Sequence, residues 1–106
     1  MISIEEKKTI LIYRLERIDL IIKEIEYLIK SGYYVTAMNR IYFSNFYIVM
    51  CLALLKDYKT SKHKQLMGWF IKEFVFSGKI GKECFQIYKN SYDDRIQGEY
   101  DFRTFE

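Results

Sequence analysis

The stretch that decides the fold is SGYYVTAMNRIYFSNFYIVMCLALL, residues 31–55, in which Arg40 is the only charged residue. The chain contains no proline, so nothing in this stretch forbids a continuous helix. A helix that is apolar on nearly every side has to be covered on most of them. We therefore expect a central helix over residues 34–56, buried by the other helices of the domain.

A long amphipathic pattern precedes this stretch. Apolar residues recur there at alternating spacings of four and three, at Leu11, Leu15, Ile18, Ile22, Ile25 and Ile29. This periodicity is typical of a helix with one buried face, and it turns Arg14 outward. Ser3 followed by Glu6 fits a capping box at the start of the helix. We expect this helix over residues 4–30, ended by Ser31 and Gly32.

Two more helices are expected after a polar linker, residues 56–62. The first spans residues 63–76, and its inward residues are Leu66, Met67, Phe70 and Phe74. The second spans residues 80–95, and its apolar stripe is Cys84, Ile87, Tyr88 and Tyr92. Gly98 then interrupts the pattern, which leaves residues 97–106 as a C-terminal tail. The sequence predicts one all-α domain, residues 1–106, folded as an antiparallel up-and-down four-helix bundle.

Composition limits the kinds of function. The 106 residues carry a net charge of +3, which allows nucleic-acid binding without requiring it. One histidine and two distant cysteines form no zinc motif, so we expect no metal and no cofactor. We recognise no signal peptide, and the apolar run around residues 41–55 is shorter than a membrane span. We therefore expect a cytoplasmic protein with two buried thiols and no membrane contact.

Arg40 is the first candidate for a functional side chain. It shares one helical face with Thr36, Ser44 and Tyr47, a polar strip on an otherwise apolar helix. A guanidinium there needs a partner, because an unpaired buried charge is costly. One interpretation is an internal salt bridge, to Asp93, Asp94 or Glu99. The other is a phosphate-binding or RNA-binding cleft lined by Arg40 and Tyr47.

His63 is the second candidate, at the expected start of the third helix. Lys59, Lys62 and Lys64 surround it, and a helix N-terminus attracts anions. A histidine can serve as an acid or a base near neutral pH. The alternative is that His63 only caps or packs against the helix. Its neighbour Lys64 is a candidate anion contact in the first interpretation.

Arg95 is the third candidate. By helical spacing it shares a face with Tyr88 and Tyr92, so it does not lie on the far solvent side. One interpretation is that Arg95 only compensates the helix dipole in the last turn. The other places it with Tyr100 and Asp101 in a polar cluster at the mouth of a cleft.

Three segments in this order resemble the small, stand-alone subgroup of HEPN-domain proteins. AMNRIYFSNFYIVMCLALL, residues 37–55, is similar to their central helix, with paired aromatics and an Ala-Leu-Leu ending. SKHKQLMGWFIKEFVFSGKI, residues 61–80, is similar to the next segment, which starts with Ser/Thr-x-His-Lys. YDDRIQGEYDF, residues 92–102, is similar to their Arg-x-x-Ala/Gly-Asp/Glu-Tyr ending.

This resemblance implies a helical bundle that forms a homodimer and is paired with a minimal nucleotidyltransferase as toxin and antitoxin. Active members of the family cleave RNA without metal, using an arginine followed after a few residues by a histidine. Arg95 matches that arginine, whereas Tyr100, Asp101 and Phe102 occupy the positions where the histidine falls. The pairing also suggests that the partner nucleotidylates Tyr100. Relatives continue into a further helix, so we expect either that a partner supplies it here or that this version of the fold is trimmed.

Three functions follow as alternatives. The first is a HEPN-type protein without the usual ribonuclease site that binds a nucleotidyltransferase, RNA or a nucleotide through Arg40, His63, Lys64 and Arg95. The second is a metal-independent ribonuclease toxin that pairs Arg95 with Tyr100, or with His63 from elsewhere in the fold. The third is a helical interaction module with no ligand.

Overall fold

The structure is a computed structural model that describes the backbone of residues 2–105 and the side chains of residues 2–97. Over this range the chain is helical and contains no strand. The helices are α1 (Ile4–Lys30), α2 (Tyr34–Leu55), α3 (His63–Phe70) and α4 (Lys82–Phe105), and α3 continues into the π-helical turn η1 (Ile71–Val75). The prediction of four helices and no strand is confirmed for these residues.

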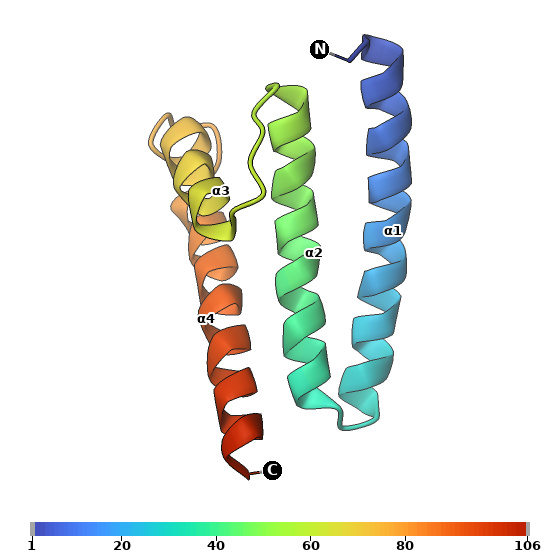
Figure 1. Cartoon of the computed structure of the whole chain (residues 1–106), viewed down its shortest axis with the longest axis vertical. Coiled ribbons are helices and arrows are strands. Elements are labelled where there is room, and N and C mark those ends of the chain that lie inside the picture. Colours follow the sequence, from blue (N-terminus) through green and yellow to red (C-terminus); the bar gives the residue numbers. More distant parts are fainter. Residues whose placement is uncertain (1, 106) are drawn as a thin grey trace.

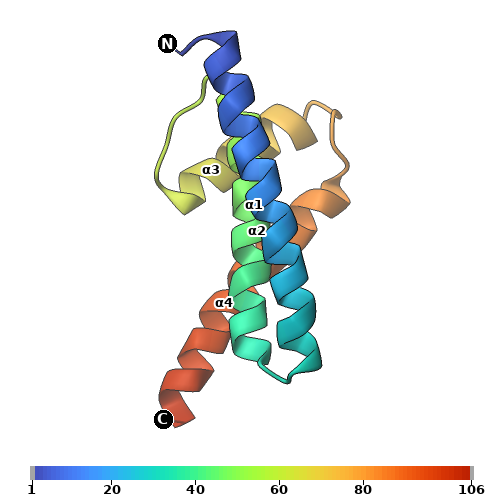
Figure 2. The ribbon, with the colours of Figure 1, turned by 90° about the vertical axis from the view of Figure 1, so that its right-hand side faces the viewer.

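The three long helices lie side by side, with α2 between α1 and α4 (Figure 1). The short α3 lies across α2 on the side where α4 packs, and the linker that leads to it bows away from the end of α2 (Figure 2). α2 is thus the central helix, as the sequence predicts. The finer expectation of an antiparallel up-and-down four-helix bundle stays a prediction.

The ends of α1 follow from its sequence. Ser3 Oγ accepts a hydrogen bond from the Glu6 amide at 3.1 Å, and the Glu6 carboxylate accepts one from the Ser3 amide at 3.4 Å. At the other end Gly32 has a φ of +81°, a conformation that glycine adopts without strain. The predicted capping box and the predicted end of the helix are both confirmed.

The buried face of α1 differs from the prediction. Ile18 and Ile21 are buried, whereas Leu15, Ile22 and Ile29 are exposed. Arg14, expected to point outward, is half-buried instead. The reason is that α1 lies against α2 alone at the edge of the layer (Figure 1), so only a narrow stripe is covered. Both neighbouring stripes of α1 are apolar, and the sequence pattern cannot separate them.

The core lies between α2, α3, η1 and α4. Tyr42 and Leu66 are fully buried. The rest of this cluster is Val49, Ala53, Met67, Phe70, Phe74 and Tyr88. All four inward residues predicted for the third helix belong to it, and that prediction is confirmed.

The predicted end of the last helix at residue 95 is wrong, because α4 continues past Gly98 to Phe105. A glycine costs a helix only about 1 kcal/mol and removes no backbone donor, so it does not have to end one. The apolar stripe of α4 is also narrower than predicted. Tyr88 is buried, but Ile87 and Cys84 are exposed, and Cys51 is the buried thiol.

α2 has 22 residues and, by length and composition alone, could span a membrane. The prediction that this apolar segment is too short to cross a membrane, which rested on residues 41–55 alone, is therefore wrong. In the fold α2 packs between α1 and α4 (Figure 1). The cytoplasmic location stays a prediction.

Candidate functional site

A cleft of about 470 Å³ lies where the first turn of α3 meets α2 and α4. We call it the His63–Arg95 cleft. Its lining side chains come from α2, the linker, α3 and α4: Phe43, Lys62, His63, Lys64, Gln65, Tyr92 and Arg95. The fold therefore brings His63, Lys64 and Arg95, three of the candidates, to one place.

His63 is held by aromatic residues of α2. Its ring stacks on Phe46, with the ring centroids 4.3 Å apart and an angle of 11° between the planes. Its Nδ1 atom forms a hydrogen bond with the hydroxyl of Tyr42. Because these contacts fix the plane of the ring and occupy Nδ1, Nε2 is the nitrogen left for a ligand.

Two pKa shifts set the charges in this pair. Burial, together with the nearby Arg95, lowers the pKa of His63. Burial also raises the pKa of Tyr42 to about 12. Both groups are therefore neutral at pH 7, and the positive charge of the cleft comes from its arginine and lysines.

We expect the stability of the domain to report the shift at His63. A histidine with a lowered pKa in the folded state stabilises that state above the pKa of the unfolded chain, and the contribution is lost as the pH falls through the folded value. Denaturant unfolding of the wild type should therefore lose stability between about pH 7 and pH 5 more steeply than His63→Gln does. Equal slopes for the two proteins would contradict the lowered pKa.

Arg95 is positioned by a second contact to α2. Its Nε atom donates a hydrogen bond to the side-chain oxygen of Asn39 at 2.7 Å. Its guanidinium carbon lies 5.3 Å from the ring centre of Tyr42 and 5.2 Å from that of Phe43. Such cation–π contacts, together with the hydrogen bond to Asn39, orient the guanidinium.

The start of α3 adds to the positive field of the cleft. The N-cap residue Lys62 forms no capping hydrogen bond through its side chain. The Leu66 amide donates to the Lys62 carbonyl at 3.0 Å, so the amides before Leu66 have no carbonyl partner within the helix. Exposed amides at a helix N-terminus attract anions. The residues that carry these amides, His63, Lys64 and Gln65, line the cleft.

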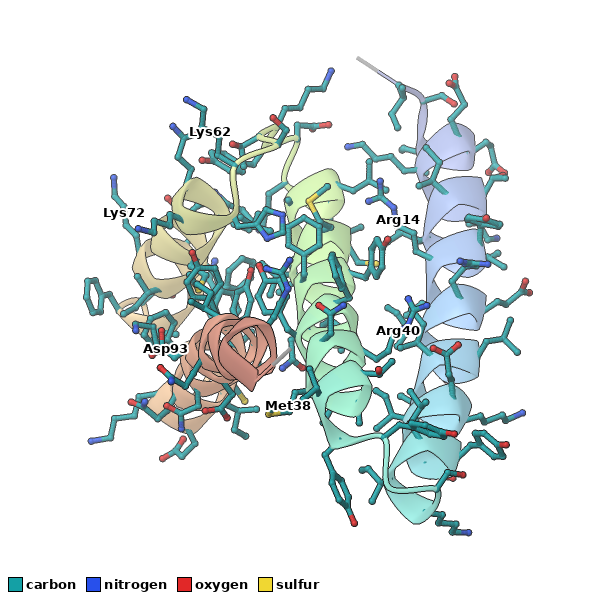
Figure 3. The ribbon with its side chains drawn as sticks, turned by 60° about the horizontal axis from the view of Figure 1, so that its bottom comes forward. Arg14, Met38, Arg40, Lys62, Lys72 and Asp93 are labelled. Carbon is teal, nitrogen blue, oxygen red and sulfur yellow. The ribbon has the colours of Figure 1, made fainter. Side chains whose placement is uncertain are left out.

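Arg40 and Tyr47 lie outside this cleft. Arg40 Nε is 2.6 Å from a carboxylate oxygen of Glu24, in an ion pair between α2 and α1 whose side chains are both about half exposed. Figure 3 shows Arg40 in the space between these two helices. The partner is Glu24 rather than Asp93 or Asp94, and the third predicted partner, Glu99, falls among the residues whose side chains the structure does not describe. Tyr47 is 38% exposed and packs edge-on against Phe46.

Two other candidates, Tyr100 and Asp101, fall among the residues whose side chains the structure does not describe. Among the described residues no group of three or more His, Cys, Asp or Glu could hold a metal ion.

Sequence reasoning missed the α2 residues that hold the cleft together. Asn39, Tyr42, Phe43 and Phe46 are spaced by three, one and three residues, which places them on one helical face. That spacing was a usable signal, because it sets polar Asn39 in line with aromatic residues. The polar strip with Arg40 and Tyr47, which the sequence offered as a binding face, lies beside this face and does not line the cleft.

Comparison with known proteins gives two relatives. The chain is 35% identical over 95 residues to a UPF0332 protein of Thermotoga maritima, covering 90% of this chain and 72% of that protein. It is 32% identical over 87 residues to a protein of Methanocaldococcus jannaschii named "Putative toxin MJ0142", covering 82% of this chain and 59% of that protein. No family model and no solved structure matches the chain.

Proposed function

The chain belongs to the UPF0332 family, and on that basis we propose that it is a HEPN-type toxin–antitoxin component that binds a phosphate of RNA or of a nucleotide in the His63–Arg95 cleft. The name of the Methanocaldococcus relative supports the toxin part of this proposal. The chain covers less than two thirds of that relative, so the activity of the whole protein is part of the proposal.

The observation that carries the proposal is the convergence of cationic groups on one cleft. Arg95 from α4 and Lys62 and Lys64 at the start of α3 line it together. A guanidinium binds a phosphate through two parallel hydrogen bonds, and helix amides add further donors. Phe43 and Tyr92 line the same cleft and offer rings on which a base can stack.

The test is binding of a fluorescently labelled single-stranded RNA, followed by anisotropy at several salt concentrations. Phosphate contacts release counterions, so affinity should fall steeply between about 50 and 200 mM salt. Inorganic phosphate should compete with the RNA. If neither the RNA nor adenosine monophosphate is bound even at the lowest salt concentration, the proposal fails and the third alternative, an interaction module, is favoured.

We also propose that the protein acts as a homodimer and binds a minimal nucleotidyltransferase. Large apolar side chains are exposed on two adjoining helices, among them Leu15 and Ile22 of α1 and Ile48 of α2. Exposed apolar side chains of this size favour association with another protein. Sedimentation of the chain alone measures the homodimer, and sedimentation with the nucleotidyltransferase measures the second association. The intact mass of the chain after incubation with the nucleotidyltransferase and ATP tests the modification of Tyr100.

A metal-independent ribonuclease is the second candidate, and one observation favours it. His63, from a different part of the sequence, lines the same cleft as Arg95. A neutral histidine can accept the proton of a ribose hydroxyl, and the guanidinium can stabilise the charge that develops on the phosphate.

For this candidate we expect cleavage of total RNA in EDTA, lost by about 100-fold or more in His63→Gln. Binding of RNA by His63→Gln should persist, because the cations of the cleft remain. The measurement is gel analysis of RNA after timed incubation, with Lys23→Gln as a surface control. RNA that stays intact with the wild type would exclude the ribonuclease and leave the binding protein.

A further inference from the structure

A second cleft, of about 420 Å³, lies on the α1 side of the same linker. We call it the Arg14 cleft. Residues of α1, of the end of α2 and of the linker line it: Arg14, Met50, Ala53, Leu54, Tyr58, Lys59, Thr60 and Ser61. It shares no lining residue with the His63–Arg95 cleft, and no function considered so far uses it.

Arg14 is the unusual side chain in this cleft. It is half-buried, and its Nη1 atom donates a hydrogen bond to the backbone carbonyl of Met50 at 3.3 Å. Figure 3 shows it reaching from α1 towards α2. A guanidinium carries five N–H donors, so a single neutral acceptor leaves most of them for other partners.

Two other cations of α1 and α2, Lys7 and Arg40, are paired with carboxylates. Lys7 lies 2.8 Å from a carboxylate oxygen of Asp57, and Arg40 lies 2.6 Å from one of Glu24. Arg14 forms no such ion pair with any residue whose side chain the structure describes. Because a partly buried charge is costly without a counter-charge, this site favours an anion from solution.

The linker supplies further donors to the Arg14 cleft. Lys59 and Ser61 are exposed and line it. Thr60 is already engaged, since its hydroxyl donates to the side-chain oxygen of Gln65 at 2.8 Å and accepts from the Lys62 amide at 3.1 Å. These bonds fix the linker between the two clefts, so that residues up to Ser61 line one and residues from Lys62 line the other.

Tyr58 anchors the other end of this segment. Its ring stacks on Trp69 at 4.7 Å, and its amide donates to the Ala53 carbonyl at 2.9 Å. The basic segment that follows is thus held at both ends, between the end of α2 and the first turn of α3. The backbone between the two clefts is thereby held in place, which lowers the entropic cost of binding a chain along it.

We propose that the Arg14 cleft is a second phosphate subsite, which binds a backbone phosphate of the same RNA that occupies the His63–Arg95 cleft. Arg14 contributes its free N–H donors, and Lys59 and Ser61 contribute charge and a hydroxyl from the opposite wall. The RNA then runs along linker residues 59–62 from one cleft to the other. This subsite rests on the proposed RNA binding and extends it to a longer substrate.

The test compares a short ligand with a long one. In Arg14→Gln the affinity for a single-stranded RNA of about twelve nucleotides should fall about 3- to 10-fold, and the slope of log affinity against log salt should fall by about one. Binding of adenosine monophosphate, which fills only the His63–Arg95 cleft, should not change. Arg17→Gln is the matched control, because it removes an equal charge from an exposed position on the same helix.

Three results separate this subsite from the proposed function. If the twelve-nucleotide RNA binds Arg14→Gln and Arg17→Gln equally, the second subsite is excluded while the first cleft stands. If the wild type binds neither ligand, the proposed function itself fails. Should Arg14→Gln lose its helical circular dichroism, Lys59→Gln combined with Ser61→Ala serves instead, since both residues are exposed, and an unchanged affinity in that variant excludes the subsite.

Discussion

Replacing Arg95 by glutamine is expected to weaken the binding of single-stranded RNA by about 10- to 100-fold. Arg95 supplies a guanidinium to the His63–Arg95 cleft. Its loss should cost the contribution of a hydrogen bond to a charged group, about 1.5–3 kcal/mol. Its contact to Asn39, at 2.7 Å, and the two rings beneath it set its orientation before a ligand arrives. Fluorescence anisotropy with the labelled RNA measures the loss.

Two further variants test whether the loss of RNA affinity is specific to the Arg95 guanidinium. Arg17→Gln changes the net charge equally on an exposed part of α1, and its affinity should stay within about twofold of the wild type. Arg95→Lys keeps the charge but loses the Nε donor to Asn39 and the planar fork, so its affinity should fall between those of the wild type and Arg95→Gln. If all three variants bind like the wild type, the cleft is not the RNA site.

Replacing Tyr42 by alanine is expected to lower the free energy of unfolding by about 3–5 kcal/mol. Tyr42 is fully buried, and its ring touches those of His63, Tyr88 and Tyr92. The loss is a large part of the roughly 5–15 kcal/mol by which domains are stable. Urea unfolding followed by circular dichroism measures it.

Tyr42→Phe keeps the ring and removes only the hydroxyl that contacts His63. Its cost should be about 1 kcal/mol, the usual net contribution of one hydrogen bond. Tyr47→Ala is the control on the same helix, because Tyr47 is 38% exposed and should cost clearly less than Tyr42→Ala. Equal losses for Tyr42→Ala and Tyr47→Ala would mean that Tyr42 is not the centre of the core.

Local patterns predicted much of the fold. Ser3 and Glu6 mark the start of α1 because a capping box needs only residues three positions apart. The inward face of α3 was predictable because Leu66, Met67 and Phe70 recur at helical spacing after a polar first turn. The face of α1 was not, because Leu15 and Ile22 make a second apolar stripe that the helix leaves exposed.

The candidate site was predictable in its parts and not in its assembly. His63 and Lys64 stood out from their residue types and their position at a helix start, and Arg95 from the helical face that it shares with Tyr88 and Tyr92. Their convergence in one cleft depends on how α3 and α4 pack on α2. The partners that orient His63 and Arg95, namely Tyr42 and Asn39, come from that packing as well.

The sequence by itself determined where the first three helices begin and that the apolar helix is the central one, since helix caps and helical periodicity act within a few residues. Only the tertiary structure decided which way each helix is turned about its own axis. That rotation directs Arg14 inward, pairs Arg40 with Glu24 and sets His63 beside Arg95. It is decided by packing between helices far apart in the chain, which no local pattern records.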